Sequence, residues 1–310
     1  MVRLARLPQM ICDHVVASVY RPGWAIRYEY LRLPKSSRRQ KRLFVLAHYA
    51  DNARVHPYVY FYLNAMREAG CDTLVISAAG SLRAKDIERL QASNIGLVIR
   101  NNIGYDFGSW RAALHVYPTL HQDYSTVIFA NDSVYGPFGN INDTLNRMEQ
   151  AGHDVWGMTS SMECGYHLQS YFWALSKKAL NSGLIEYFWH HYYRHHSRRQ
   201  AVINRYELKL AQIAKRRFGL RATAVYAGRG EDGDSLSAEN PTLHTASPLL
   251  CQHGVPFIKR ELFKLRLLEQ KAQDELVEVA GNKNAECCAL MLDHLASQSM
   301  LCGIDKRLVK

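Results

Sequence analysis

Three polar residues end an apolar run near the middle of the chain, and their types suit ligand chemistry. The segment VIFANDSVYGPF, residues 127–138, begins like a buried strand and then reaches Asn131, Asp132 and Ser133. In open parallel sheets, ligands lie beyond the carboxyl ends of the strands. We therefore expect Asn131 and Asp132 to stand at the edge of a ligand site. A carboxylate that only caps a turn is the alternative interpretation of Asp132.

A second polar segment, RNNIGYDFGSW at residues 100–110, follows the preceding predicted strand. Gly104 and Gly108 flank Asp106, and a backbone without side chains can approach a ligand closely. A helix amino terminus behind such a loop can receive a phosphate or a nucleotide. Any sharp strand-to-helix turn can use glycine in the same way, so the glycines alone do not decide the function. The residues in and next to this segment that we expect to bind the ligand are Arg100, Asn101, Gly104, Asp106 and Arg111.

Short apolar runs alternate with amphipathic stretches, and this alternation predicts the elements that position these residues. The expected strands are 42–50, 72–80, 95–102, 124–132, 153–161 and 221–227. The expected helices are 56–70, 81–94 with Ser81 as its cap, 107–117, 142–152, and a long aromatic and basic stretch at about 183–217. Strands joined by helical crossovers imply a parallel sheet, and hence an α/β fold. Residues 228–240 have the composition of a surface loop, and 257–310 carry apolar residues at helical intervals, which predicts helices docked on the main domain.

Composition limits the class of protein. The chain has 310 residues, of which 47% are hydrophobic and 22% charged, as in ordinary globular proteins. It contains no run of about 18 uncharged apolar residues that could cross a bilayer. Seven cysteines without a C-x-x-C pair favour reduced thiols in the cytosol. We expect no signal peptide, because Asp13 interrupts the apolar residues at the N-terminus.

Most of the net charge of +11 lies at the N-terminus, where residues 1–42 hold ten Lys and Arg against Asp13 and Glu29. Basic residues interleaved with aromatic and aliphatic ones suit an anionic membrane surface. A solvated charged arm is the alternative. Nucleic acid is not expected as a partner, because the rest of the chain lacks zinc-finger, helix-turn-helix and aromatic RNA-binding signatures.

Several unusual strings occur in order along the chain, among them GYDFGSW, NDSVYGP, HLQSYF and NPTLHTASPLLCQHGVPFIKRELF. Together they resemble the rhamnan synthesis protein F family of polysaccharide-assembling glycosyltransferases. The resemblance spans about residues 43–265. A basic N-terminal arm, residues 1–42, and a helical C-terminal tail, residues 266–310, lie outside this resemblance. Within the matching part, we expect a nucleotide-sugar half, 43–161, and an acceptor half, 162–265.

The resemblance implies a GT-A-like α/β domain, with a mostly parallel sheet flanked by helices, that uses a nucleotide sugar. Such enzymes carry an Asp-x-Asp motif at the point where NDS stands here, so the resemblance implies that Asp132 holds a divalent ion, Mg²⁺ or Mn²⁺. This chain has only one of the two carboxylates, which puts tight metal binding in doubt. One carboxylate with diphosphate oxygens and waters still suffices for Mg²⁺ in many sites. Arg100 or Arg111 is expected to assist the departing diphosphate.

Further roles are expected for residues on other predicted elements. Asp51 and Ser77 follow the first two strands and are expected to meet the base and the ribose. Glu207 resembles the acidic residue that opens a helix in inverting GT-A enzymes and is the expected catalytic base, with Asp154 as the alternate base. His167, Gln169 and Tyr171 would share one face of an extended segment and bind the acceptor. We reject a metal site at His191 and His195, because no third ligand is evident.

The sequence thus predicts a cytoplasmic glycosyltransferase on the inner face of the membrane. It would pass a sugar, with dTDP-rhamnose as one possible donor, to a lipid-linked glycan acceptor of a surface polysaccharide such as lipopolysaccharide O-antigen, with inversion. Two other classes remain open. One is a non-catalytic glycan-binding or scaffold protein of a polysaccharide assembly complex, which the single carboxylate favours. The other is a nucleic-acid-binding protein recruited by the basic arm.

Overall fold

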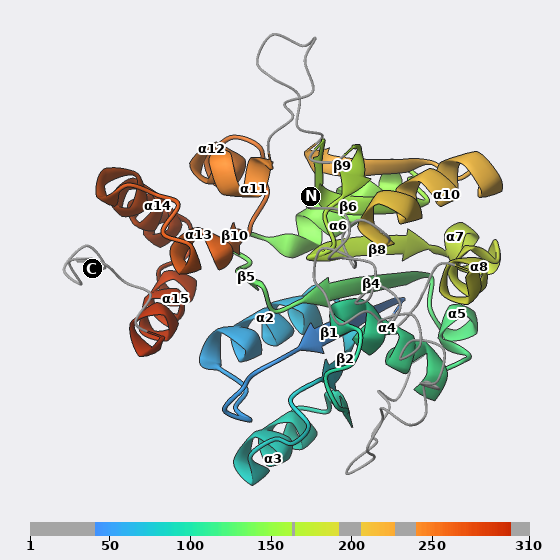
Figure 1. Ribbon diagram of the computed structural model, residues 1–310, viewed down its shortest axis with the longest axis horizontal. Coiled ribbons are helices and arrows are strands. Elements are labelled where there is room, and N and C mark those ends of the chain that lie inside the picture. Colours follow the sequence, from blue (N-terminus) through green and yellow to red (C-terminus); the bar gives the residue numbers. More distant parts are fainter. Residues whose placement is uncertain (1–40, 163–164, 192–205, 227–239, 299–310) are drawn as a thin grey trace, which may run out of the picture.

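The computed structural model describes residues 41–162, 165–191, 206–226 and 240–298. Within these residues, eight strands form one sheet in the order β3-β2-β1-β4-β8-β6-β7, and β9 also pairs with β6 (Figure 1). The strands are β1 (Arg42–His48), β2 (Cys71–Ser77), β3 (Gly96–Ile99), β4 (Thr126–Asn131), β6 (Val155–Ser161), β7 (His167–Leu168), β8 (Phe172–Ser176) and β9 (Ala222–Tyr226). Residues 1–40 of the expected basic arm, the histidines beyond His191 and most of the predicted loop at 228–240 lie outside the described residues.

The sheet is mostly parallel. β1 pairs in parallel with β2 and β4, β2 with β3, and β6 with β9, whereas β8 runs antiparallel to its neighbours β4 and β6. The expected α/β class, with a mostly parallel sheet flanked by helices, is confirmed. The carboxyl ends of β1, β2, β3 and β4 therefore meet at one edge of the sheet.

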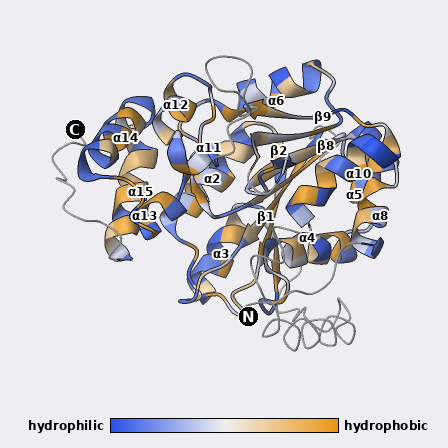
Figure 2. Ribbon diagram, turned by 45° about the horizontal axis from the view of Figure 1, so that its top comes forward, coloured by the Kyte–Doolittle hydropathy of each residue, from blue (hydrophilic) through white to orange (hydrophobic). Residues whose placement is uncertain are grey.

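Helices cover both faces of the sheet, and apolar cores lie between them. One core contains residues of α2 (Pro57–Glu68), α3 (Ala84–Ala92), α6 (Ile141–Gln150), α12 (Ala246–Cys251), α13 (Glu261–Lys264), α14 (Gln270–Lys283) and α15 (Ala285–Ser297). The other contains residues of α4 (Tyr105–Val116), α5 (Leu120–Asp123), α7 (Lys177–Asn181), α8 (Leu184–His191) and α10 (Leu208–Phe218). Alternate β1 residues face opposite cores, Phe44 on one side and Val45 on the other. Hydrophobic colours accordingly dominate the strands between the helices (Figure 2).

Local signals set several of the boundaries. Pro57 stands in the first turn of α2, and Gly70, after its end, has a φ of 76°, which glycine adopts without strain. The start of α3 differs from the prediction. The helix begins at Ala84 behind Arg83, and Ser81 does not cap it. α6 begins as predicted near Asn142, because Asn140 caps it by accepting a hydrogen bond from the Asn142 N–H.

The C-terminal helices dock on the sheet domain, as the pattern of apolar residues predicted. α14 and α15 form a pair beside α2, and their buried residues include Leu276, Met291 and Leu295 (Figure 1). Just before them, β10 (Ile258–Lys259) pairs antiparallel with β5 (Val134–Tyr135), while the short α11 (Pro241–His244) lies upstream. This small second sheet was not predicted, and it carries residues 258–260 to the end of β4. None of the described helices is long and apolar enough to cross a membrane.

Candidate active site

The end of β4 and the start of α4 meet as the sequence predicted. The amide nitrogen of Asn131 donates to a carboxylate oxygen of Asp106 at 2.8 Å. The side-chain oxygen Oδ1 of Asn131 accepts hydrogen bonds from the backbone N–H of Ser133 at 3.1 Å and from its hydroxyl at 2.6 Å. The side chain of Asn131 therefore binds Asp106 through its nitrogen and the turn at Ser133 through its oxygen. Asp132 is part of the same turn.

The Asp106 carboxyl group has a shifted pKa. Burial raises the pKa of Asp106 to about 6, and the nearby charges of Asp132 and Glu207 also raise it. The hydrogen bond from Asn131 and the charge of Lys259 oppose the shift. The charges of Asp132, Glu207 and Lys259 are therefore close enough to Asp106 to change its pKa.

Two basic residues that sequence reasoning missed complete this group. Lys259 Nζ lies 3.3 Å from Ser133 Oγ and 5.1 Å from the centre of the Tyr171 ring. Arg260 Nη1 donates to the Asp132 carbonyl at 2.9 Å and to the Tyr58 hydroxyl at 2.7 Å, and lies 3.9 Å from Asp132 Oδ2. The signal available in the sequence was the pair itself, KR, inside the block FIKRELF. Its partner could not be read from the sequence, because 126 or more residues separate the pair from Asp132 and Ser133.

Glu207 lies just before α10, and its charge acts on the pKa of Asp106. The neighbours of the two residues, Phe107 and Tyr206, pack against each other with ring centres 5.0 Å apart and ring planes at 41°. The hydroxyl of Ser170 donates to Glu207 Oε1, and His167 Nε2 lies 3.8 Å from Glu207 Oε2. Only 14% of the Glu207 side chain is exposed, so contacts with Ser170 and His167, rather than solvent, surround much of its carboxylate.

The expected acceptor face is only partly formed. His167 points to Glu207, and its Nδ1 lies 2.9 Å from the Gly165 carbonyl. Gln169 and Tyr171 are buried, as is His167, and both contact Thr159, whose hydroxyl lies 2.6 Å from Gln169 Oε1 and 3.1 Å from the Tyr171 hydroxyl. The strand β7 ends at Leu168, so strict alternation does not extend through residue 171. The side chains of Gln169 and Tyr171 belong to the core beside the site.

The loop before α4 is built from its own contacts. Arg100 is buried, donates to Ser109 Oγ at 2.9 Å and to the Ile103 carbonyl, and so ties the loop to the helix. Gly104 has a φ of 79° at the amino end of α4, which explains the glycine there. Asn101, half-buried, is part of the same loop. Arg100 thus shapes the loop that presents Asp106, and the predicted contact of its guanidinium with a ligand stays a prediction.

Two aromatic residues near the group are exposed. The backbone N–H of Tyr49 donates to Asp132 Oδ2 at 3.3 Å, and its side chain is 49% exposed. Tyr105, next to Asp106, is 36% exposed and has a φ of 53°, a backbone conformation that residues other than glycine rarely adopt. These residues were not singled out in the sequence.

Two of the predicted residues lie away from this group. Asp154 precedes β6 at the opposite edge of the sheet, where it accepts hydrogen bonds from the Arg221 N–H at 2.8 Å and from Lys178 at 3.0 Å. Burial alone would raise the pKa of Asp154. The hydrogen bonds and charges of Arg221 and Lys178 outweigh this effect, so the pKa lies below its usual value. Arg111 lines a groove of about 340 Å³ with Leu180 and Trp189. Asp154 therefore does not lie with the other predicted residues, because a strand about 17 Å long separates it from Asp132.

The residues at the ends of the first two strands differ in exposure. Ser77 is fully buried, and its hydroxyl lies 3.0 Å from Nδ1 of His48. The pKa of His48 is lowered, chiefly by burial. Asp51 is exposed beyond β1. Of these two, only Asp51 presents a side chain to solvent at this edge.

The donor set around Asp132 does not match the metal site that the family resemblance implied. Asp132 Oδ2 faces the Tyr49 N–H and the guanidinium of Arg260. The side-chain oxygen Oδ1 of Asn131 already accepts hydrogen bonds from Ser133. Within the described residues, no group of three or more His, Cys, Asp or Glu is arranged to hold a metal ion. A resident Mg²⁺ or Mn²⁺ bound through Oδ2 of Asp132 would share that oxygen with the Tyr49 N–H and the Arg260 guanidinium.

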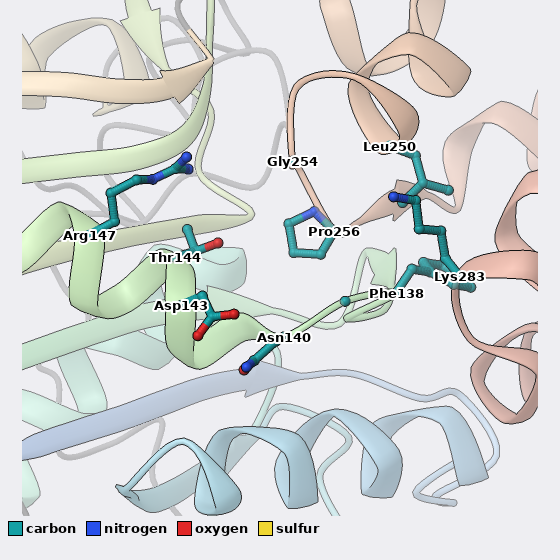
Figure 3. A pocket seen from close by; sticks show the side chains of 10 residues that line it. Phe138, Asn140, Asp143, Thr144, Arg147, Leu250, Gly254, Pro256 and Lys283 are labelled. Atoms are coloured by element: carbon teal, nitrogen blue, oxygen red, sulfur yellow. The ribbon is translucent and has the colours of Figure 1, made fainter.

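A separate groove of about 240 Å³ lies between α6, the segment before β10 and the end of α14 (Figure 3). Arg147 and Lys283 stand at its two sides, with Pro256 between them. None of the predicted site residues lines it.

Comparisons with known proteins agree with the resemblance and extend it. The family model RgpF, described as rhamnan synthesis protein F, matches residues 74–304. The match starts later than the stretch inferred from the sequence, at 43, and runs past 265 to include α14 and α15. This extension fits the structure, since both helices contribute to the core.

Two relatives illustrate the distance to other proteins. Virulence protein VirA of Vibrio anguillarum is 26% identical over 218 residues, which cover 62% of this chain and 68% of VirA. The uncharacterized protein y4gN of Sinorhizobium fredii is 25% identical over 173 residues, which cover 54% of this chain and 44% of y4gN.

Solved structures with a similar arrangement have low sequence identity to this chain and include a mannosyltransferase. Mannosyltransferase PcManGT from Pyrobaculum calidifontis, in complex with GDP-Man and Mn²⁺, is 12% identical with a TM-score of 0.38, over 97% of this chain and 87% of that one. TarS of S. aureus, in complex with UDP-GlcNAc, is 11% identical with a TM-score of 0.38, over 82% and 85%. These likenesses are too distant to add to the assignment. The family match, in contrast, covers well over half of the chain, and the protein belongs to the rhamnan synthesis protein F family.

Proposed function

We propose that this protein is a nucleotide-sugar-dependent glycosyltransferase that extends a bacterial surface polysaccharide. The observation that carries the proposal is the gathering of Asp106, Asp132 and Glu207 with Lys259 and Arg260 at the carboxyl edge of the sheet. Family membership supports the same activity. Transfer from a nucleoside diphosphate needs positive charge for the leaving diphosphate and a base for the acceptor hydroxyl.

In this proposal, Glu207 is the base. It takes the proton of the acceptor hydroxyl while the acceptor oxygen bonds to the anomeric carbon and the bond from that carbon to the diphosphate breaks. Ser170 and His167 hold the carboxylate of Glu207 in place. An attack from the side opposite the leaving group inverts the anomeric centre, as expected for a single base without a covalent intermediate.

The donor site lies around Asp132 in this proposal. Asp51 and the exposed rings of Tyr49 and Tyr105 flank the edge where a base and a sugar would lie, and an aromatic face suits either. The loop with Asn101 and Gly104 borders the same edge. The expected divalent ion is not part of this mechanism, because the donor set described above does not supply its ligands.

The finer identity of the substrates is also a proposal. The family description favours rhamnose, and dTDP-rhamnose is the first donor to test. For the acceptor we propose a lipid-linked glycan at the inner face of the cytoplasmic membrane. The basic segment at residues 1–42 supports this location, because its charge suits an anionic surface.

The test is a nucleotide-binding screen of the full chain by thermal shift, with UDP, GDP and dTDP and their sugars. A ligand that binds only the folded state raises the melting temperature. We expect one nucleotide to do so and the matching sugar nucleotide to support transfer to a membrane glycan fraction. No response to any nucleotide, together with intact polymer synthesis by Asp132→Ala and Glu207→Ala variants in cells, would instead favour the scaffold function.

A further inference from the structure

The structure points to a specific source of positive charge at this site. We propose that Lys259 and Arg260 bind the diphosphate of the donor directly and that nucleotide binding needs no divalent ion. The inference rests on the proposed function, since it names how that site recognises a nucleoside diphosphate.

The backbone fixes the positions of both cations. Lys259 pairs with Val134 across the β5–β10 sheet, and the Arg260 N–H donates to the Ser133 carbonyl at 3.0 Å. The segment thus runs directly alongside the turn at Asp132. Cations held on paired backbone lose little freedom when an anion binds, in contrast to long side chains on a loop.

The side chains approach this turn at two adjacent points. Lys259 reaches the hydroxyl of Ser133, and Arg260 reaches the carbonyl and carboxylate of Asp132. A diphosphate offers two neighbouring anionic groups, one for each of these side chains. A lysine acts on phosphate as a point charge, and an arginine offers a planar set of donors.

The surrounding charges make such cations necessary. Asp106, Asp132 and Glu207 would repel a diphosphate, and the mutual effect of these carboxylates is visible in the raised pKa of Asp106. Arg260 stays protonated under all relevant conditions, and its proximity to Asp132 and Tyr58 raises its pKa further, against the opposing effect of burial. Without Lys259 and Arg260, the site would hold only negative charge among these groups.

The same contacts disfavour a divalent ion at Asp132. The guanidinium stands 3.9 Å from Asp132 Oδ2, so an ion bound to that oxygen would face a fixed positive charge. A metal ion and the guanidinium of Arg260 would therefore compete for the carboxylate of Asp132. The departure from the paired carboxylates of the Asp-x-Asp motif and the presence of Arg260 therefore have one explanation, in which side chains replace the metal.

The test uses the full chain and measures the dissociation constants of UDP, GDP and dTDP by calorimetry, in EDTA and in MnCl₂. We expect the preferred nucleotide to bind with the same affinity in both buffers. Lys259→Gln is expected to weaken binding about 10-fold or more, because one partner of a charge-assisted contact is lost. Lys259→Arg retains the charge and should restore most of the affinity.

Lys264→Gln is the matched control, since Lys264 is exposed on α13, five residues away, and should leave affinity unchanged. Melting temperatures show which variants fold. If Lys259→Gln does not fold, the comparison of EDTA with MnCl₂ on the unaltered chain decides the question alone.

Binding that requires Mn²⁺ and is unaffected by Lys259→Gln would overturn the inference and leave the proposed function intact. Failure of every nucleotide to bind in both buffers would overturn the proposed function, and the inference with it.

Discussion

At the scale of single residues, the candidate site contains a carboxyl group with a raised pKa, that of Asp106. Asp106 is half-buried beside two other acidic groups, and Asn131 is its hydrogen-bond donor. Its neighbours Phe107 and Trp110 pack in the core, which keeps the start of α4 in place. The protonation of this one residue is therefore linked to folding.

The Asp106 carboxyl group predicts a pH dependence of stability. Its pKa in the folded chain is about 6, whereas an unfolded aspartate titrates near 3.9. Between these values the unfolded chain releases the proton and the folded chain keeps it, so stability falls as pH rises from about 4 to 6. Asp106→Asn removes this contribution.

Denaturant unfolding at pH 4 to 7 checks the prediction. The free energy of unfolding of Asp106→Asn, relative to the unaltered chain, should rise by about 2 kcal/mol over this range, allowing for partial solvent screening. A constant difference between the two chains would show that Asp106 titrates normally.

A second prediction concerns the base. Glu207→Gln keeps the shape and removes the proton acceptor, so transfer should fall about 10²- to 10⁴-fold while nucleotide affinity stays within about twofold. Asp154→Asn is the comparison at the opposite edge of the sheet and should retain transfer. Single-turnover assays with the donor found in the binding screen measure both. Equal losses in the two variants would argue that the Glu207 effect is structural.

At the scale of elements, the C-terminal helices support the segment that carries the cations. His294 of α15 lies 2.7 Å from the hydroxyl of Tyr135 and against the ring of Tyr58, and Tyr58 in turn accepts a hydrogen bond from Arg260. Burial, followed by the charge of Arg260, lowers the pKa of His294 to about 3. The neutral imidazole therefore belongs to the packed contact between α15, α2 and β5.

This arrangement predicts that α15 contributes to global stability. Leu295→Ala opens a cavity in a fully buried position and should lower the free energy of unfolding by about 2–5 kcal/mol. Leu267→Ala, at a position that is 46% exposed, should change it by less than about 0.5 kcal/mol. Chemical denaturation of the two variants provides the comparison. Similar small effects would mean that α15 folds as a separate appendage.

At the scale of the whole molecule, the sheet separates Asp154 from the carboxylates of the candidate site. The parallel strands β1 to β4 direct their carboxyl ends to the edge where Asp132 lies, while Asp154 is paired with Lys178 and Arg221 at the other edge. The positive charge of the chain is likewise uneven, since residues 1–42 hold most of the excess.

The uneven charge leads to a prediction about membrane binding. The full chain should sediment with anionic vesicles at low salt and be released by high salt, since each basic residue contributes on the order of 1 kcal/mol that salt screens. Replacing the eight Lys and Arg of residues 1–40 by Gln should abolish sedimentation and preserve the melting temperature. Equal sedimentation of both chains would place the membrane contact elsewhere.

The sequence by itself determined the α/β class, most strand positions and the meeting of Asn131 and Asp132 with the loop around Asp106. These features follow from periodicity and from the rule that parallel strands end at one edge, both of which are local or topological. The tertiary structure alone decided that Lys259 and Arg260 stand beside Asp132, that Ser170 holds Glu207, and that Asp154 lies at the far edge. Those contacts join segments up to 128 residues apart through an antiparallel strand and a small second sheet. No periodic pattern encodes such pairings, because they depend on how whole elements pack against one another.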